Sequence, residues 1–425
     1  MVRIREILAG ALISAHLMIK AQHQRSEVDD SQYADEVLVN NYPAQEAQIL
    51  SLTDSGASQA VDPLQVEIVY NHYIQDGSNS AVTGGIGTEK LMVYGPSLRV
   101  RKDRANHYVQ MHTGVDIISS ASADNIDFIV SSASRLDGRG YLYGTYGHHL
   151  KGSGLTLDGG LGLSLESDYS SLKTEIGVAK ESADQMKKYS LQFQMYNDDL
   201  RWGLFHSGYY RPTKLIYPFE LRNRNRKWYE THNRNSYILK GGYTQVLNRR
   251  NMIGLFADLT LQKGLLATPF HRIYFTDGFL KVEQLPYERW KGGIAFRLNS
   301  FVGGAIILKN TVNLYSDSFG IRALTTQNET SIKITPVLIV TPHFRFYVQQ
   351  GSRYFAGYGE HERTERYFTS DYDLSSFETY TMGIGLKKRF VHKSALQTVA
   401  LRYSYMHRSN GLQAHIISTS FQLDK

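Results

Sequence analysis

The segment LTLDGGLGLSLE, residues 155–166, places a leucine at almost every second position. Successive side chains of a β-strand point to opposite faces, so these leucines share one face while Thr156 and Asp158 occupy the other. The same period of two recurs in NMIGLFADLTLQ (251–262), TVALRYSYMH (398–407) and IISTSFQLDK (416–425). The pattern dominates the chain from residue 65 onward and predicts strands with one apolar face and one polar or small face.

These segments are about 9–13 residues long, the length at which a tilted strand crosses an outer membrane. Long polar connections are predicted at 117–138, 211–235, 264–287 and 356–376, and short ones at 102–105, 248–251, near 303 and at 341–343. Long loops on one side and short turns on the other are typical of bacterial barrels. We therefore predict an all-β fold, an outer-membrane antiparallel β-barrel of about 16 strands within a range of about 14–18.

Aromatic residues near segment ends (Tyr70 and Tyr73, Tyr209 and Tyr210, Trp290, Tyr354 and Phe355) are interpreted as interfacial girdles. The alternative to a barrel is a soluble protein of several sheets, such as a lectin or propeller. No repeat of blade length is visible in the sequence, which disfavours that alternative.

The N-terminus has the pattern of a secretory signal peptide. Arg3 and Arg5 precede an apolar run, Ile7–Ile19, and small Ala21 follows it, so residues 1–21 are predicted to be removed. No later run approaches the roughly 18 apolar residues that a membrane-spanning helix needs. Residues 22–64 carry eight carboxylates against the single cation Arg25 and are predicted to be an acidic irregular leader or a plug, with the barrel over 65–425.

Signals of catalysis are missing from the sequence. The chain has no cysteine, which excludes disulfides and thiolate metal sites. It has no zinc-protease, nucleophile-elbow, P-loop or dinucleotide motif, so we expect no enzyme activity and no catalytic residue. His148 and His149 are adjacent and would point to opposite faces of a strand, and scattered histidines such as His271 receive no role. No metal site is expected.

A basic, aromatic stretch at 211–235 contains Arg222, Arg224, Arg226, Lys227 and Trp228. It is a candidate patch for anions, for acidic lipopolysaccharide or for a partner. A solvated basic loop is the alternative. Nucleic acid is not expected as a partner of an exported protein.

The tetrapeptide Ser-Ser-Ala-Ser occurs at 119–122 and again at 131–134. With Asp116, the first copy resembles the acceptor motif of FAD:protein FMN transferases, Asp-x-x-(Ser/Thr)-(Gly/Ser)-Ala-(Thr/Ser). That resemblance makes Ser122 the hydroxyl that takes covalent FMN and Asp116 the motif aspartate, with Ser119, Ser120 and Ala121 between them. The second copy lacks the aspartate. The alternative for both copies is packing of small residues in a loop.

Several blocks together, among them AVTGGIGTEKLMVYGP (81–96) and VEQLPYERWKGGIAFRLN (282–299), resemble an uncharacterised outer-membrane barrel family, domain-of-unknown-function family 3570. The resemblance covers roughly residues 65–425. It implies a barrel in the outer membrane of a Gram-negative bacterium, encoded beside an FMN transferase, a small lipoprotein and a thioredoxin-like protein, all candidate partners. It supplies no established catalytic residues.

Three functions stay open on the sequence. The first is the membrane component of a flavin-linked extracytoplasmic redox or electron-transfer system, which would carry FMN on Ser122 or on a partner. The second is a passive pore that favours anions, because the barrel region is basic. The third is a docking barrel for a lipoprotein or secretion partner.

Overall fold

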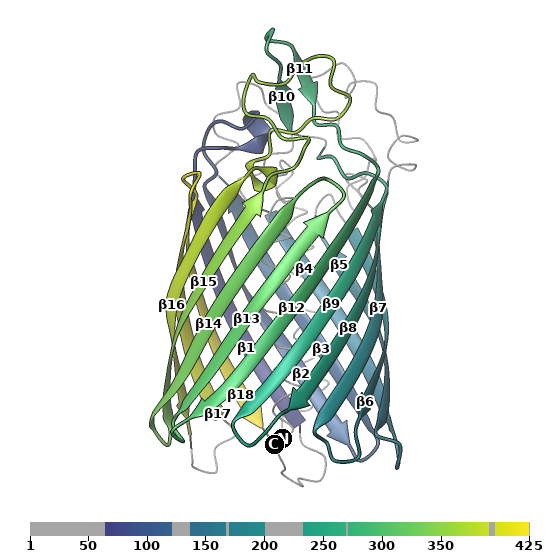
Figure 1. Ribbon diagram of the computed structural model, residues 1–425, viewed down its shortest axis with the longest axis vertical. Coiled ribbons are helices and arrows are strands. Elements are labelled where there is room, and N and C mark those ends of the chain that lie inside the picture. The colour runs from purple at the N-terminus through teal and green to yellow at the C-terminus, as the bar shows by residue number, and fades with distance from the viewer. Residues whose placement is uncertain are drawn as a thin grey trace, which may run out of the picture.

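The computed structural model describes residues 64–120, 137–166, 170–199, 233–268, 271–390 and 396–424. Sixteen antiparallel strands form one closed barrel (Figure 1). They are β1 (Leu64–Asp76), β2 (Leu91–Arg104), β3 (His107–Ser120), β4 (Asp137–Leu150), β5 (Leu155–Leu165), β6 (Ser170–Glu181), β7 (Lys187–Asp199), β8 (Arg234–Val246), β9 (Asn251–Lys263), β12 (Glu288–Val302), β13 (Ile306–Asp317), β14 (Arg322–Thr335), β15 (Leu338–Gln350), β16 (Phe377–Arg389), β17 (Leu396–Arg408) and β18 (Gln413–Asp424).

The barrel closes by pairing its first and last strands. Residues Gln65 to Asp76 of β1 run antiparallel to Gln413–Asp424 of β18. Closure removes the unpaired edges that an open sheet would leave. The predicted fold class and strand number are confirmed. Among the described residues, no helix is long and apolar enough to cross a membrane.

The outer surface of the barrel is apolar. Leu161 and Ile176, which lie in the middle of their strands, expose 66% and 65% of their surface. Exposed leucine, isoleucine, phenylalanine and tyrosine side chains recur at every second position of most strands. An apolar patch of this extent is far larger than a soluble monomer exposes, and it matches the lipid-facing band of a transmembrane barrel.

The two rims of the barrel differ. The lower rim in Figure 1 holds short turns such as 105–106, 247–250 and 303–305, and β1 begins and β18 ends there. The upper rim carries an elaborate structure that we call the cap: residues 77–90, 264–287 and 351–376 where they are described. The cap includes the short strands β10 (Arg272–Tyr274) and β11 (Leu280–Val282) and the 3-10 turns η1 (Ala81–Thr83) and η3 (Tyr372–Leu374).

Two details of the sequence prediction are wrong. The turn predicted at 341–343 lies inside β15, and the chain reverses at residues 336–337 instead. Pro342 is tolerated in the strand because the ladder between β14 and β15 is interrupted there. Of the predicted girdle, Tyr70 and Trp290 face outward, but Tyr73 is buried inside the barrel. Tyr73 is three residues after Tyr70 on the same strand, and residues an odd number of positions apart point to opposite faces. Tyr354 and Phe355 belong to the cap.

Candidate functional site

The inner face of the barrel is polar and holds ion pairs. Glu175 of β6 lies 2.5 Å from the ammonium of Lys173 and accepts hydrogen bonds from Thr145 (3.0 Å) and Gln194 (3.3 Å). Charged groups are placed inside a protein only where partners or water compensate them. The polar face of the strands therefore lines the lumen, and the apolar face that the alternation predicts lies outside.

One half of the lumen, the wall from β12 to β17, carries an excess of positive charge. Glu329 of β14 accepts from Lys309 at 3.0 Å and from Arg402 at 3.2 Å. Residues that alternate along a strand with the exposed outer residues point into the lumen, and several of these inward residues on the same wall are cations. The inward cations of these strands include Arg289, Lys291, Arg297, Lys309, Arg345 and Arg402, and their inward carboxylates, among the described residues, are Asp317 and Glu329. Two carboxylates cannot neutralise six cations.

The facing wall, from β2 to β9, mixes both signs of charge. Inward-facing carboxylates there include Asp158, Glu175 and Asp258, and inward cations include Lys173 and Lys240. Lys240 of β8 lies directly across the ladder from Asp258 of β9. The lumen thus has a basic half and a nearly balanced half, so the electrostatic potential across it is asymmetric.

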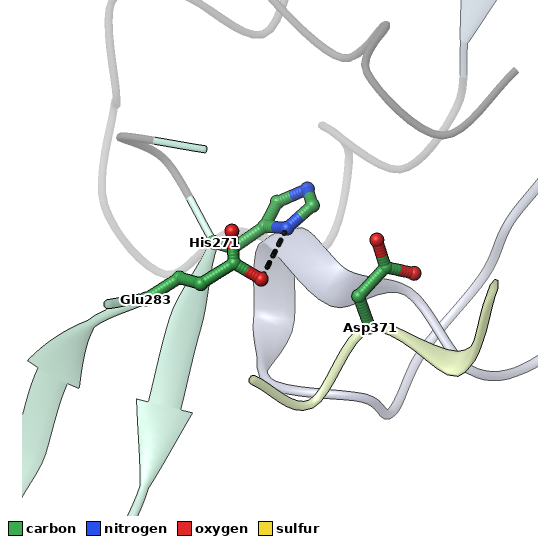
Figure 2. A group of neighbouring side chains, drawn as sticks. All are labelled: His271, Glu283 and Asp371. Carbon is green, nitrogen blue, oxygen red and sulfur yellow. Dashed lines mark hydrogen bonds and ion pairs between the residues drawn. The ribbon is translucent and has the colours of Figure 1, made fainter. Parts of the chain in front are cut away.

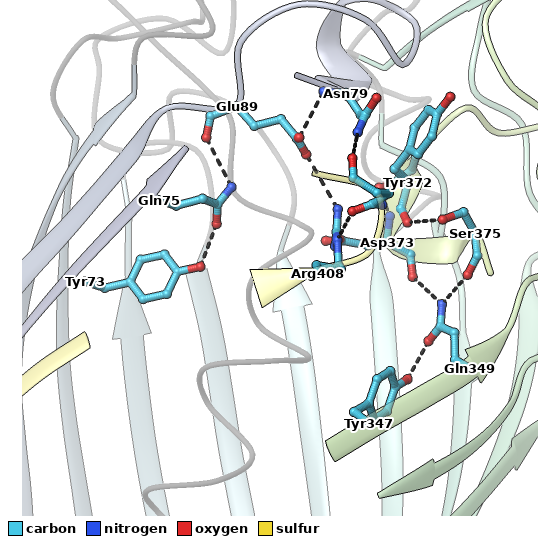
Figure 3. A network of polar contacts seen from close by, with 12 residues as sticks. Tyr73, Gln75, Asn79, Glu89, Tyr347, Gln349, Tyr372, Asp373, Ser375 and Arg408 are labelled. Atoms are coloured by element: carbon cyan, nitrogen blue, oxygen red, sulfur yellow. Dashed lines mark hydrogen bonds and ion pairs between the residues drawn. The ribbon is translucent and has the colours of Figure 1, made fainter. Parts of the chain in front are cut away.

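The cap is fastened to the upper rim by a group of residues that we call the latch: Glu89, Gln349, Asp373 and Arg408 (Figure 3). Arg408, the last residue of β17, is 1% exposed and donates a hydrogen bond to Asp373 of η3. Its guanidinium also lies 3.8 Å from Glu89 and stacks over the Phe377 ring at 4.7 Å. The charge of one arginine therefore holds two cap segments against the barrel wall.

A second part of the latch uses backbone groups. The side-chain amide of Gln349, at the top of β15, donates to the carbonyl of Asp373 at 2.8 Å and to that of Ser375 at 2.6 Å. Asn79 donates to the carbonyl of Asn410 at 2.9 Å, which ties the loop before β2 to the turn after β17. Figure 3 shows Asn79, Asp373 and Gln349 grouped around Arg408. The cap is therefore seated on the rim through two of its three segments, 77–90 and 351–376.

The two long arms of the cap, 264–287 and 351–376, are paired with each other. Gln284 and Phe368 exchange backbone hydrogen bonds of 3.2 and 2.8 Å. Ile273, Phe275 and Phe368 form a buried apolar cluster between the arms. The apolar cluster and the backbone pairing together make the arms one packed unit.

The glycine-rich stretch at 83–87 explains how the third segment reaches the arms. Gly85 has φ +94°, and a Cβ there would come within 3.0 Å of the Ser370 carbonyl oxygen. Gly84, at φ +86°, lies against the ring of Tyr274. Glycine is the residue that combines this backbone conformation with so close an approach. The stretch lies in the connection between β1 and β2 at the upper rim.

A titratable trio lies inside the cap: His271, Glu283 and Asp371 (Figure 2). One ligand atom of each residue lies within 4.8 Å of the others. Burial lowers the pKa of His271, but the carboxylates of Glu283 and Asp371 more than offset this and leave that pKa raised. Burial, and then repulsion from Asp373, raise the pKa of Asp371 to about 7. The trio therefore places one imidazole and two carboxylates together within the described cap.

The predicted site residues fall partly outside the described residues. Asp116, Ser119 and Ser120 lie in β3, where Asp116 faces the lumen across the ladder from Arg139 of β4. Ala121 and Ser122, the remaining residues of the predicted FMN acceptor, lie outside the described part of the chain, as do Arg222, Arg224, Arg226, Lys227 and Trp228. Both sites remain predictions.

Sequence reasoning missed the residues of the latch and of the trio. Asp371 is a hundred positions after His271, and Arg408 is far from Glu89, so no local spacing links them. The excess of cations from β12 to β17 could have been found in the sequence. Assigning each Lys and Arg to the inner or outer face of its strand by the period of two reveals it.

A closed antiparallel barrel with an apolar exterior and a charged interior is the architecture of transmembrane β-barrel proteins. The chain belongs to the family described as Protein of unknown function (DUF3570), which matches residues 137–420. The family that the sequence resembles is thereby confirmed. No curated protein matches the chain.

Solved structures of outer-membrane barrels are similar to this chain at low identity. OccK1 (OpdK) of Pseudomonas aeruginosa has 9% identity and a TM-score of 0.40, with 85% of this chain and 99% of that chain covered. A BenF-like porin from Pseudomonas fluorescens Pf-5 has 10% identity and a TM-score of 0.41, with coverage of 85% and 99%. A bacterial polysaccharide outer membrane secretin has 7% identity and a TM-score of 0.44, with coverage of 86% and 99%.

Proposed function

We propose that the protein is an outer-membrane channel whose lumen favours anionic solutes. The observation that carries this proposal is the cation excess on the wall from β12 to β17, inside a barrel with an apolar exterior. A narrow passage lined by one sign of charge, with walls of low dielectric constant, raises the local concentration of ions of the opposite sign. Small anions would therefore pass more readily than cations of the same size.

The cap and the leader limit what enters. The cap lies over the upper rim, the side on which bacterial barrels carry their long external loops (Figure 1). The leader 22–64, with its eight carboxylates, has the charge that would complement the basic wall, and we propose that it acts as a plug. Both features make this a selective passage rather than a wide diffusion pore.

Single-channel recording in planar bilayers tests the channel. With a salt gradient across the bilayer, the wild-type reversal potential is expected to show a preference for anions. Arg297→Gln removes one lumen charge from β12 and is expected to lower the anion-to-cation permeability ratio about tenfold, because a unit charge about 6 Å from an ion contributes about 0.7 kcal/mol in water, with opposite signs for an anion and a cation.

The matched control is Lys151→Gln, which removes a charge from the exposed turn after β4 at the lower rim. It is expected to leave the permeability ratio close to that of the wild type. A wild-type barrel that prefers cations contradicts the anion proposal. A folded barrel that conducts nothing contradicts the channel, and favours the docking barrel for a lipoprotein or secretion partner.

The second candidate function is the membrane component of a flavin-linked redox system. The Asp116–Ser122 motif and the family resemblance favour it. The structure adds a condition: Ile117 and Ile118 are paired with both β2 and β4, Asp116 is paired with β4, and Ser119 and Ser120 are paired with β2, so most of the motif is part of the barrel wall. A transferase that binds the Asp116–Ser122 motif as an extended, unpaired segment would have to act before the barrel closes.

Covalent FMN on Ser122 is therefore expected when the transferase is co-expressed with the exported chain, and not when it is added to the purified, folded barrel. In-gel flavin fluorescence and the mass of the peptide that contains Ser122 measure this. Ser122→Ala should abolish the label, whereas Ser134→Ala, in the second Ser-Ser-Ala-Ser copy, should keep it. An unlabelled wild-type chain after co-expression rules out FMN on this protein.

A further inference from the structure

The trio of the cap brings together two residues of the 264–287 arm and one residue of the distant 351–376 arm. His271 precedes β10, Glu283 follows β11, and Asp371 precedes η3. The side chains of His271 and Glu283 are buried, with 6% and 4% of their surface exposed, and Asp371 is partly buried. Figure 2 shows the imidazole and the two carboxylates grouped together. No role in the lumen or in the latch accounts for this group.

An ion pair between His271 and Glu283 explains the trio poorly. The Nδ1 to Oε1 distance is 3.5 Å, whereas charge-assisted N–H···O hydrogen bonds are about 2.7–2.9 Å long. Two carboxylates face a single imidazole, so a protonated imidazole can pair with only one of them. Buried carboxylates of this kind are normally compensated by a further cation.

The spacing fits a small divalent ion. Zinc lies about 2.0–2.2 Å from nitrogen and oxygen ligands in a tetrahedral site, so two of its ligand atoms are roughly 3.4 Å apart. The Nδ1 to Oε1 distance of 3.5 Å matches this separation. The ligand atoms of the whole trio lie within 4.8 Å, so a rotation of the Asp371 side chain would bring the third ligand into place.

The side chain of Glu283 is held by hydrogen bonds of the kind that usually orient a metal-binding carboxylate. Its Oε1 accepts a hydrogen bond of 2.5 Å from the Thr369 hydroxyl, and its Oε2 accepts one of 2.6 Å from the backbone N–H of Thr268. Such outer contacts fix the orientation of a ligating carboxylate. Thr369 in turn accepts from the N–H of Asp371 at 3.1 Å, so one hydroxyl orients both acidic residues.

We propose that His271, Glu283 and Asp371 form a site for one divalent transition-metal ion of the Zn²⁺ type, and that this ion joins the two arms of the cap. One nitrogen and two carboxylate oxygens suit zinc better than calcium, which prefers an all-oxygen shell of six to eight ligands. Three protein ligands leave a fourth position for water. The ion would tie the 264–287 arm to the 351–376 arm and hold the cap closed.

The experiment is a titration of the purified, folded, chelator-treated full-length barrel with zinc chloride, followed by isothermal calorimetry. One equivalent of Zn²⁺ is expected to bind the wild type. Glu283→Gln keeps the size and one acceptor of the side chain but removes its charge, and Asp371→Asn does the same at the second carboxylate. Each is expected to weaken binding at least about 10-fold, and Thr369→Val by about 10- to 100-fold through the lost orientation.

The matched control is Glu365→Gln. Glu365 contacts a different cap histidine, His361, at 2.7 Å, so this variant removes a carboxylate from a His–carboxylate pair outside the trio. It is expected to bind Zn²⁺ as the wild type does. Heat-modifiable gel mobility confirms that each barrel is folded. A wild type that binds no Zn²⁺, or trio variants that bind it as tightly as the wild type, overturns the proposal without affecting the channel.

A second readout reports on the joining of the arms. Hydrogen exchange of the backbone in 271–283 and 361–371 should slow at least about tenfold when Zn²⁺ is added to the wild type in large excess over its dissociation constant, because an ion that binds only the closed cap stabilises it. The same addition should leave Glu283→Gln unchanged. Zinc binding without slower exchange in these segments would contradict the closing role.

Discussion

Ile176→Arg is expected to destabilise the membrane-inserted barrel by about 2–4 kcal/mol. Ile176 lies in the middle of β6, exposes 65% of its surface, and is flanked across the ladders by Gly159 of β5 and Phe193 of β7. If this surface contacts lipid, the guanidinium would have to enter hydrocarbon or distort the bilayer to reach water. Urea titration of the barrel folded into lipid vesicles measures the loss.

The control for this substitution is Ala179→Arg on the same strand. Ala179 alternates with Ile176 and therefore faces the lumen, where water and charged neighbours can accommodate a cation. We expect it to cost much less than Ile176→Arg. An equal cost for both variants, or no cost for Ile176→Arg, would show that the apolar belt does not lie in a bilayer.

The barrel wall could be predicted from the sequence because a strand that separates lipid from water repeats its chemistry every two residues. Leu157, Leu161 and Leu163 were assigned to one face, and all three are exposed on the outer surface. The rule fails where a local signal misleads. Pro342 suggests a turn, yet it fits within β15 at a gap in the ladder. Tyr73 is aromatic and near a strand end, but it alternates with the outward-facing residues of β1 and therefore points into the barrel.

The cap could not be predicted in this way, because its structure depends on contacts between segments distant in the sequence. His271, Glu283 and Asp371 meet only after the barrel has brought two upper loops together. Neither loop alternates regularly, and each contains its own short turns and strands. The charge asymmetry of the lumen could be predicted only in part. The sequence tells which charged residues of each strand point inward. The order of the strands around the barrel is needed as well, because it decides which of these charges lie on the same wall.

Arg408→Ala is expected to release the cap, at a cost of about 3–5 kcal/mol, which is typical of removing one member of a buried ion pair. The substitution leaves Asp373 and Glu89 close together without the guanidinium that lies between them, and it removes the stacking on Phe377. The cap segment 351–376 should then exchange its amide hydrogens faster and become sensitive to protease. In the bilayer, the mean conductance of the channel should rise.

The double variant Arg408→Ala/Asp373→Asn separates the cost of the orphaned carboxylate from the loss of the latch. It should recover part of the stability of the cap, since it removes the unpaired charge, but not the slow exchange of 351–376. Lys151→Ala, in the exposed turn after β4, is the control and should change neither property. If Arg408→Ala leaves exchange and conductance as in the wild type, Arg408 does not hold the cap, and the backbone contacts of Gln349 must suffice.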